Sequence, residues 1–245
     1  MTPPCLVGVG VGPGDPELLT VKAVRVMREA DVVFVPVMGD DVVGRAERTV
    51  REQVPAECIR RIVFALDDRG GLTPRREGAW DAASRAVADA FGDGARTVCF
   101  ATIGDPNVYS TFAYLADGVR ALVPDLIVET VPGITAMQDL ASRSGTSLCE
   151  GTESLALLPL TAGLETFEQA LRTHDTVVAY KGGRQLADVV ETLRGVDRLD
   201  TAVYGAALGL PDEDIRPLRE VDAASAPYLS TVIVPARRTG RGGRL

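Results

Sequence analysis

Apolar runs alternate with segments in which apolar residues recur at helical spacing, beginning with the first residues of the chain. The runs at 6–11, 32–37, 62–65, 97–102 and 127–131 are typical of buried strands. Helical spacing predicts helices at 16–30, 45–53, 80–91, 112–122 and 135–144, and the polar stretch 67–76 is expected to be a loop. Asp15 is the expected N-cap of the first helix, with Pro16 at its first position. This alternation predicts βαβ units that share a mainly parallel sheet.

After Gly145 the pattern changes to shorter strands and shorter helices. Strands are expected at 155–158, 176–180, 201–204 and 228–234, and helices near 166–172 and 185–193. A length of 245 residues allows one large domain or two small ones. We therefore expect an α/β fold with two α/β domains, at 1–146 and 147–235, and strands of mixed direction in the second. The arginine-rich segment 236–245 is predicted to be a disordered basic tail.

The composition excludes several classes of protein. Apolar residues make up 46% and charged residues 24% of the chain, which is typical of a globular protein and not of disordered, collagen-like or coiled-coil chains. Aromatic residues are only 5% and the formal net charge is -8, so we expect no nucleic-acid partner. The first residues lack the features of a secretory signal, and no apolar run approaches the roughly 18 residues of a membrane span. The sequence predicts a cytoplasmic protein with no membrane partner.

Neither the cysteines nor the histidine form a pattern typical of a metal site or a nucleophile. The four cysteines, Cys5, Cys58, Cys99 and Cys149, are too widely spaced for a local CxxC pair or zinc knuckle, and we expect reduced thiols in the core. Any Ser/His/Asp triad or multi-histidine metal site would have to rest on His174, the one histidine. Its place at the expected end of a helix favours a surface position. We predict no metal centre and assign no catalytic acid or base.

A glycine-rich loop follows the first expected strand and leads into the first helix. It reads Gly8-Val-Gly10-Val-Gly12-Pro13-Gly14-Asp15-Pro16. The dinucleotide-binding pattern G-x-G-x-x-G fails in both registers, because Pro13 or Asp15 stands where the third glycine would be. A phosphate-binding P-loop also lacks its Lys-Ser/Thr pair. What remains is bare backbone at the carboxyl end of a strand, where ligands approach open α/β sheets, or a tight turn with no ligand.

Two more Gly/Pro loops follow expected strands. One is Ile103-Gly104-Asp105-Pro106, after the strand at 97–102, and the other is Val131-Pro132-Gly133-Ile134-Thr135-Ala136, after the strand at 127–131. The carboxyl ends of parallel strands lie along one edge of a sheet. We therefore predict that the three loops converge on one ligand-binding crevice.

These three loops resemble the signatures of the tetrapyrrole methylases, which use S-adenosylmethionine in corrin and sirohaem synthesis. The first signature extends through Gly10-Val-Gly12-Pro13-Gly14-Asp15-Pro16-Glu17-Leu18-Leu19-Thr20, and the resemblance covers nearly the whole chain. The segments 104–112, 150–156 and 228–232 are most similar to the branch of the family that methylates carbon 20 of precorrin-2 in cobalamin synthesis.

The resemblance implies a homodimer of two-domain α/β chains, with S-adenosylmethionine folded into the cleft between the domains. The positions that match the family's cofactor contacts are Pro13, Ile103, Gly104, Asp105, Val108, Thr135, Ala136, Lys181 and Ala206. Many relatives carry methionine where Lys181 stands. Because a cation beside a sulfonium is unfavourable, the expected contacts of Lys181 are through its backbone or aliphatic stem.

The implied chemistry fits these residue types. Asp105 can accept hydrogen bonds from the ribose or the amino-acid end of the cofactor, and the glycine and proline loops admit adenosine against bare backbone. Methyl transfer is an in-line displacement at the sulfonium carbon by the electron-rich meso carbon of the substrate. Alignment and desolvation supply much of the rate of such a step without a strong base.

The implied substrate is a tetrapyrrole polycarboxylate, although the chain itself is acidic. Bidentate guanidinium pairs position carboxylates, so we expect arginines to line a locally basic cleft. The candidates, all near loops or helix ends, are Arg69, Arg75, Arg76, Arg143, Arg184 and Arg216. For each of them a solvated surface charge is the alternative.

Other functions remain open at this stage. Within the family, the substrate could be cobalt-precorrin-2, another corrin position or a target that is not a tetrapyrrole, and the sequence does not separate metal-free from cobalt-containing substrates. A nucleotide-dependent oxidoreductase is disfavoured by the broken glycine pattern. A ligand-binding protein without catalytic activity is the third possibility.

Overall fold

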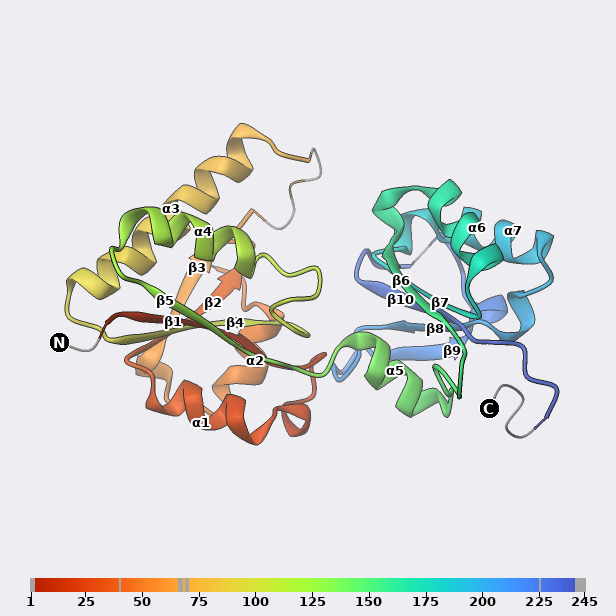
Figure 1. Cartoon of the computed structure of the whole chain (residues 1–245), viewed down its shortest axis with the longest axis horizontal. Helices are drawn as coiled ribbons and strands as arrows, with labels where there is room; N and C mark the ends of the chain where they lie inside the picture. Colours follow the sequence, from red (N-terminus) through yellow and green to blue (C-terminus); the bar gives the residue numbers. More distant parts are fainter. Residues whose placement is uncertain (1–2, 40, 66–67, 69–70, 225, 241–245) are drawn as a thin grey trace. The chain divides into compact units, whose positions relative to one another are not determined.

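The computed structural model describes residues 3–39, 41–65, 68, 71–224 and 226–240. The chain forms two compact units, Met1–Thr135 and Ala136–Leu245, each of which is an α/β structure (Figure 1). The division precedes the expected boundary at 146. The reason is that helix α5 (Ala136–Ser144), expected in the first domain, packs on strands of the second unit.

The first unit contains a five-stranded sheet whose paired strands are all parallel, in the order β3-β2-β4-β1-β5. Its strands are β1 (Cys5–Gly10), β2 (Val32–Val37), β3 (Ile59–Val63), β4 (Thr97–Thr102) and β5 (Ile127–Val131). The predicted parallel sheet is confirmed, and three strands have the predicted bounds. Strand β3 begins earlier than the apolar run at 62–65, because its first residues alternate in burial and carry two arginines.

Helices cover both faces of this sheet (Figure 1). They are α1 (Val21–Glu29), α2 (Arg45–Arg51), α3 (Pro74–Gly92) and α4 (Phe112–Leu122). Side chains of α3 and α4 pack on one face with Leu6, Phe34 and Phe100. Those of α1 and α2 pack on the other with Val9 and Val35. Because both faces are buried, the three central strands β2, β4 and β1 are nearly continuous apolar runs.

Two helix starts differ from the predictions. Asp15 caps only a short 3-10 helix, and α1 begins after Thr20, whose hydroxyl accepts the N–H of Ala23 at 3.0 Å. The single helix predicted at 16–30 is therefore wrong, because a second N-cap restarts the chain. The loop predicted at 67–76 is also too long: Thr73 caps α3, which begins at Pro74. Residues 67, 69 and 70 lie outside the described residues.

The second unit contains a five-stranded sheet in the order β6-β7-β10-β8-β9. Its strands are β6 (Leu155–Pro159), β7 (Thr176–Tyr180), β8 (Val203–Ala206), β9 (Asp214–Pro217) and β10 (Ser230–Val234). Strand β6 pairs parallel with β7, whereas β10 runs antiparallel to both β7 and β8. The expected mixed sheet is confirmed. The strand predicted at 201–204 lies two residues too early, because Leu199–Thr201 forms a 3-10 helix.

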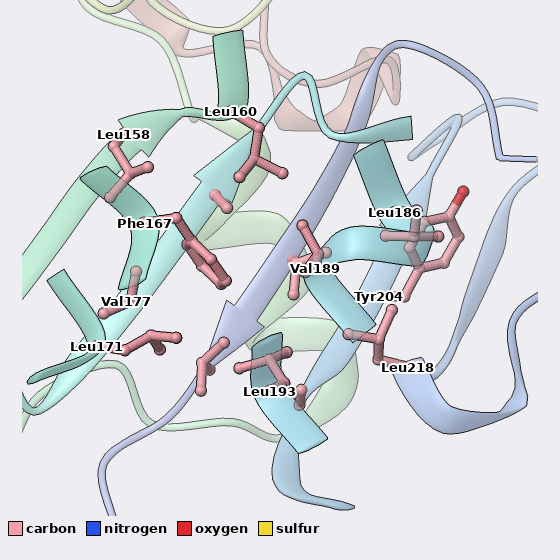
Figure 2. Packing of buried hydrophobic residues seen from close by; sticks show 14 of the residues in the cluster. Leu158, Leu160, Phe167, Leu171, Val177, Leu186, Val189, Leu193, Tyr204 and Leu218 are labelled. Atoms are coloured by element: carbon pink, nitrogen blue, oxygen red, sulfur yellow. The ribbon is translucent and has the colours of Figure 1, made fainter. Parts of the chain in front are cut away.

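Figure 2 shows the main core of the second unit, where α6 (Leu164–Thr173) and α7 (Leu186–Gly195) pack on one face of its sheet. Phe167, Val189 and Leu193 are fully buried against Val177. Helix α5 contributes Leu140 to a separate cluster with Val178 and Ile233. The unit is therefore also layered, with helices on both faces of its sheet. Further 3-10 helices in the chain are Pro16–Leu18, Ala56–Cys58, Leu160–Ala162, Gly183–Gln185 and Leu218–Glu220.

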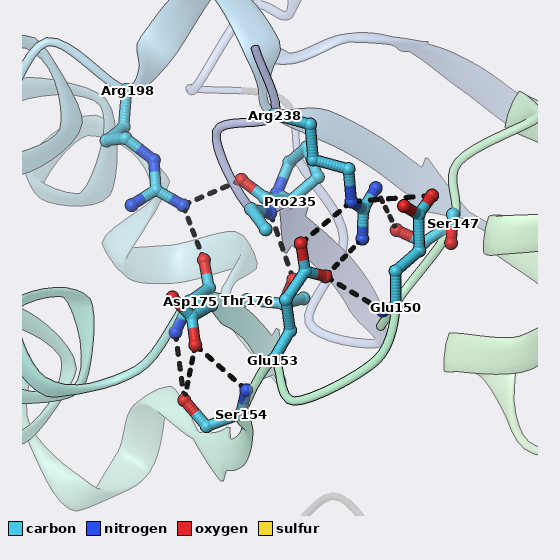
Figure 3. A network of polar contacts seen from close by, with 10 residues as sticks. Ser147, Glu150, Glu153, Ser154, Asp175, Thr176, Arg198, Pro235 and Arg238 are labelled. Atoms are coloured by element: carbon cyan, nitrogen blue, oxygen red, sulfur yellow. Dashed lines mark hydrogen bonds and ion pairs between the residues drawn. The ribbon is translucent and has the colours of Figure 1, made fainter. Parts of the chain in front are cut away.

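The segment after β10 is not a disordered tail throughout. Arg238 forms an ion pair with Glu153 at 2.6 Å, and only 5% of the Glu153 side chain is exposed (Figure 3). The guanidinium also donates to the carbonyl of Ser147 at 3.2 Å. Nearby, Arg198 donates to the carbonyls of Asp175 and Pro235. The prediction for 236–245 is therefore wrong at Arg238, because an ion pair fixes it to the segment before β6. Residues 241–245 lie outside the described residues.

This ion pair leads to a pH-dependent prediction. The hydrogen bonds from Arg238 hold the pKa of Glu153 below its ordinary value. A lowered carboxyl pKa stabilises the folded state above the unfolded pKa of about 4.3 and loses that effect as the pH falls through the folded pKa. We expect Arg238→Ala to lower the Tm at pH 7, and the difference from wild type to shrink below about pH 4. Thermal unfolding across pH measures this, with Arg237→Ala as the control because the Arg237–Asp197 pair is exposed. An unchanged Tm at pH 7 would contradict the prediction.

Three of the four cysteines fit the expectation of protected thiols. Cys99 is buried, and burial raises its pKa to about 12, so it stays a neutral thiol. Cys5 and Cys58 are half-buried. Cys149 is exposed, and the expectation of a core position is wrong there because it follows α5 in a surface segment.

Candidate functional site

The three Gly/Pro loops of the first unit leave neighbouring strands. Strands β4, β1 and β5 lie side by side in the sheet and are parallel, so their carboxyl ends share one edge. The loops that follow them begin at Val11, Ile103 and Pro132. The prediction that the three loops lie along one edge of the sheet is therefore confirmed. The ligand-binding crevice stays a prediction.

Backbone hydrogen bonds join the first loop to the second. The N–H of Gly104 donates to the carbonyl of Gly12 at 2.8 Å, and the N–H of Val11 donates to Thr102 at 2.9 Å. Gly12 and Gly104 form an antiparallel bridge beyond the ends of their parallel strands. Both adopt positive φ, 74° and 71°, a conformation that glycine enters without the steric cost of a side chain.

The carboxylate of Asp105 joins the second loop to the third. One oxygen accepts the N–H of Asn107 at 2.8 Å, and the other accepts the N–H of Gly133 at 3.0 Å. The residue is 9% exposed. Asp105 was predicted as a cofactor contact, and the structure adds that it fixes the relative position of two loops.

Glycine permits the closest approach of the first and third loops. A Cβ on Gly10 would lie 2.5 Å from the backbone nitrogen of Gly133 and 2.6 Å from the carbonyl oxygen of Gly104. A Cβ on Gly133 would lie 2.8 Å from the backbone of Gly10. These distances are far shorter than van der Waals contact, so the loops can meet only with glycine at both positions.

Helix α2 supports the first loop from behind. Thr49 is fully buried, and its hydroxyl donates to the carbonyl of Gly14 at 3.2 Å. The neighbouring Glu47 is 1% exposed and accepts hydrogen bonds from Arg51 and Arg61 at 2.9 Å. Thr49 could not be identified from the sequence, because the Gly14 carbonyl that it contacts lies 35 residues away in the chain and no local pattern marks this pair.

The predicted site residues fall into two groups, one in each unit. The first unit carries Pro13, Ile103, Gly104, Asp105, Val108 and Thr135, all in the three loops. Of these, Pro13, Asp105 and Thr135 are buried. The second unit carries Ala136, Lys181 and Ala206.

Lys181 and Ala206 lie at one edge of the second sheet. Both β7 and β8 run antiparallel to β10, so their carboxyl ends flank the start of β10 at Ser230. Ala206 pairs with Ser230 in the register of the sheet, and the N–H of Lys181 donates to the Ser230 carbonyl at 3.0 Å. Ala136 begins α5, and the next N–H, of Met137, donates to the Tyr180 hydroxyl at 2.9 Å.

Ser230 stands out among these residues. It is 3% exposed, and its hydroxyl oxygen has no hydrogen-bond partner among the described residues. A buried polar atom without a partner costs roughly 1–3 kcal/mol unless a ligand or water supplies one. In the sequence, the segment 228–232 is marked only by its family resemblance, because a missing hydrogen-bond partner cannot be read from sequence.

Some residues at or beside the predicted site residues have strained backbone. Tyr109, Lys181 and Ala207 have positive φ values of 49°, 61° and 49° although none is glycine. Tyr109 and Ala207 each follow directly on a predicted site residue, and Lys181 is itself one; such residues occur where the surrounding structure holds a functional geometry. Partial burial raises the pKa of Tyr109, so its hydroxyl remains protonated.

The candidate arginines differ in their partners. Arg143 pairs with Asp139 at 3.0 Å and Glu213 at 2.9 Å, and Arg216 pairs with Asp214 at 2.5 Å. Arg76 donates to the backbone carbonyls of Gly71 and Asp68. Arg184 lies over the ring of Tyr228, 5.3 Å from the ring centre. Arg75 also makes a contact within the chain, and Arg69 lies outside the described residues.

Among the described residues, His174 and the acidic side chains do not form a metal site. His174 ends α6, and its ring nitrogen Nδ1 lies 2.9 Å from the Thr173 hydroxyl. Within the described residues, no group of three or more His, Cys, Asp or Glu side chains could hold a metal ion. In the same part of the chain, every helix is too short or too polar to span a membrane.

Comparison with known proteins identifies relatives along nearly the whole chain. The family model for Tetrapyrrole (Corrin/Porphyrin) Methylases matches residues 5–222. A precorrin-2 C(20)-methyltransferase from Sinorhizobium sp is 34% identical over 235 residues, which cover 94% of this chain and 94% of that protein. A cobalt-precorrin-2 C(20)-methyltransferase from Salmonella typhimurium is 30% identical over 235 residues, covering 94% and 95%.

A solved structure agrees with the fold. The crystal structure of uroporphyrin-III C-methyl transferase from Thermus thermophilus complexed with S-adenyl homocysteine superposes with a TM-score of 0.63 and 22% identity. The match covers 93% of this chain and 96% of that chain. The two-unit α/β architecture is therefore that of a known methylase.

Proposed function

Because this chain belongs to the tetrapyrrole (corrin/porphyrin) methylases, we propose that it transfers a methyl group from S-adenosylmethionine to carbon 20 of precorrin-2. The observation that carries this proposal is the 34% identity, along 94% of both chains, to a protein named for that reaction. The product of the proposed reaction is precorrin-3A, an intermediate of cobalamin synthesis. The alternative substrate is cobalt-precorrin-2, which the 30% identical relative from Salmonella typhimurium is named for.

The residues at the two sheet edges fit S-adenosylmethionine. In the first unit, Pro13, Ile103, Gly104, Asp105, Val108 and Thr135 would hold it. In the second unit, Ala136, Lys181 and Ala206 would do so. The unpartnered Ser230 hydroxyl beside Ala206 supports this assignment, because it can donate to or accept from a polar ligand.

The bound cofactor supplies an electrophilic methyl group on its sulfonium. The methyl group replaces the proton of the meso carbon, and S-adenosylhomocysteine and that proton are released. The residues named above would position the cofactor for this step. No atom lies within 4 Å of the place where a Cβ on Gly104 would stand, which leaves room beside the second loop, and Asp105 fixes the third loop against the second. Alignment of the reacting groups accounts for much of the rate of such a transfer.

A direct assay tests the proposal. The purified chain is incubated with S-adenosylmethionine and either precorrin-2 or cobalt-precorrin-2, and the product is examined by mass spectrometry. We expect a mass gain of one methyl group with precorrin-2. A gain with cobalt-precorrin-2 alone would assign the alternative substrate, and no gain with either would refute both. In calorimetry, tight NAD(H) binding with no response to S-adenosylhomocysteine would instead support the oxidoreductase hypothesis.

Thr49 provides a first mutational prediction within this proposal. Thr49→Val keeps the side-chain shape but removes the only hydroxyl contact between α2 and the Gly14 carbonyl that the described residues provide. A hydrogen bond of this kind is worth about 1 kcal/mol. We expect a roughly fivefold weaker affinity for S-adenosylhomocysteine in calorimetry. Thr49→Ser should restore it, and Thr173→Val, which alters an exposed helix threonine, should leave it unchanged. Wild-type affinity in folded Thr49→Val would contradict the role.

The assembly and location of the protein belong to the same proposal. We propose a homodimer, as the family resemblance implies, and a cytoplasmic location, as the sequence predicts. Light scattering of the purified chain would report the dimer mass, and a monomer at assay concentration would contradict this part.

A further inference from the structure

Arg184 differs from Arg76, Arg143 and Arg216, which were also expected to bind substrate. Each of those three donates to a carbonyl or carboxylate of the chain itself. Arg184 is exposed, and within the described residues it has neither a carboxylate nor a carbonyl partner. Its guanidinium donors therefore remain available for an anion from solution.

The contact that Arg184 does make fixes the guanidinium without using those donors. Its central carbon lies 5.3 Å from the centre of the Tyr228 ring. A cation held over an aromatic ring is attracted by the electrons of the ring face, and the N–H groups at its edge can still bind a carboxylate. Tyr228 is itself 39% exposed, so both partners lie at the surface.

The two residues are held together by their backbones. A Cβ on Gly183 would overlap the carbonyl oxygen of Pro227 and lie 2.7 Å from that of Ala226, so only glycine allows this approach. Next to it, the N–H of Lys181 donates to the carbonyl of Ser230. The segments 181–185 and 226–230 are thus in direct backbone contact, and the Arg184–Tyr228 pair is built into this contact.

The pair lies at the sheet edge that carries Lys181, Ala206 and the unpartnered Ser230 hydroxyl. Arg184 follows Lys181 by three residues, and Tyr228 precedes Ser230 by two. The chain as a whole carries a formal net charge of -8, so an anionic ligand needs such a local cation.

We propose that Arg184, held over Tyr228, binds a carboxylate side chain of the tetrapyrrole substrate. This inference rests on the proposed function. Tyr228 acts as a positioning residue, because it fixes the guanidinium and does not itself bind the carboxylate.

Steady-state kinetics of the full chain test the inference, with whichever precorrin the wild type methylates. Loss of a charged hydrogen-bonding pair that is equal in the ground and transition states raises KM and leaves kcat unchanged. We expect Arg184→Ala to raise the KM for the tetrapyrrole about tenfold. The KM for S-adenosylmethionine and the kcat should stay within about twofold of wild type. Arg184→Lys should show an intermediate KM, because lysine cannot bind a carboxylate in a bidentate manner.

Variants of the ring separate positioning from direct binding. Tyr228→Phe keeps the ring and should retain the wild-type KM, whereas Tyr228→Leu removes it and should raise KM about threefold. Arg85→Ala is the matched control. It removes an exposed arginine of the first unit, on α3, and should leave the KM for the tetrapyrrole unchanged. An unchanged tetrapyrrole KM in Arg184→Ala overturns the inference and leaves the proposed methyl transfer standing.

A binding measurement distinguishes the two proposals if turnover is absent. Fluorescence titration with uroporphyrin III, an octacarboxylic porphyrin, reports binding without methylation. Tighter binding to wild type than to Arg184→Ala supports the inference, and equal binding overturns it. If the wild type neither methylates a precorrin nor binds the porphyrin, the proposed function itself fails and the role of Arg184 fails with it.

Discussion

Replacing Gly133 with alanine should reduce the affinity for S-adenosylhomocysteine by about 100-fold or more. The added Cβ would overlap the carbonyl oxygen of Gly104 and lie 2.8 Å from Gly10. The three atoms nearest to this Cβ belong to the backbones of Gly104 and Gly10, which cannot rotate aside as a side chain can. The third loop would have to move away from the other two, and the Gly133–Asp105 hydrogen bond would be lost with it.

The same substitution should destabilise the first unit. Overpacking a tight contact costs about 1–3 kcal/mol, and the lost hydrogen bond adds about 1 kcal/mol. Calorimetry would measure the affinity, and circular dichroism would establish that the variant is folded at the temperature used. Gly78→Ala is the matched control: it lies on α3 with open space around it, so it should keep wild-type affinity and be slightly more stable. Folded Gly133→Ala with affinity close to wild type would show that the loops need not touch.

The strands and the loops of the first unit could be predicted from sequence for a physical reason. Both faces of the sheet are covered, so β2 and β4 are short apolar runs, and glycine or proline follows closely where β4 and β5 end. The same reasoning recovered α4 with its observed bounds. Where a run is polar, the prediction failed: β9 at Asp214–Pro217 is an edge strand with no buried residue, and no apolar pattern marks it.

The domain boundary could not be placed from the pattern alone. The apolar face of α5 predicts that the helix packs on a sheet, but it does not say which one. In the structure Leu140 packs with Val178 and Ile233, which belong to the second sheet. That choice depends on contacts between residues far apart in the chain, and no local sequence signal carries it.

The loops and residues of the candidate site could be predicted from the sequence, but the hydrogen bonds that join them could not. The glycines and Asp105 were recognised from the loops that contain them. The hydrogen bond from Gly133 to Asp105 spans 28 residues, and the Thr49–Gly14 contact spans 35, so neither could be seen in the sequence. Sequence reasoning also assigned the Asp105 carboxylate to the cofactor alone, whereas both of its oxygens accept hydrogen bonds from the backbone.

These backbone bonds change what is expected of Asp105→Ala. The substitution leaves the N–H groups of Asn107 and Gly133 without their acceptor, at a cost of roughly 2–4 kcal/mol for the two together. We therefore expect a clear loss of stability as well as an affinity for S-adenosylhomocysteine reduced more than about 30-fold. The family resemblance implies only a contact of Asp105 with the cofactor, whereas these two hydrogen bonds give the carboxylate a structural role as well.

Asp105→Asn separates the two tasks. Its amide keeps one acceptor oxygen, so one of the two backbone bonds survives and the loss of stability should be about half that of Asp105→Ala. Each carboxylate oxygen can accept a further hydrogen bond beyond the one from the backbone. If Asp105 also binds the cofactor through its charge, Asp105→Asn should lose nearly as much affinity as Asp105→Ala despite its better stability. Thermal unfolding and calorimetry on the same samples give both numbers. If Asp105→Asn instead loses only about half as much affinity as Asp105→Ala, in line with its smaller loss of stability, Asp105 joins the loops and does not contact the cofactor.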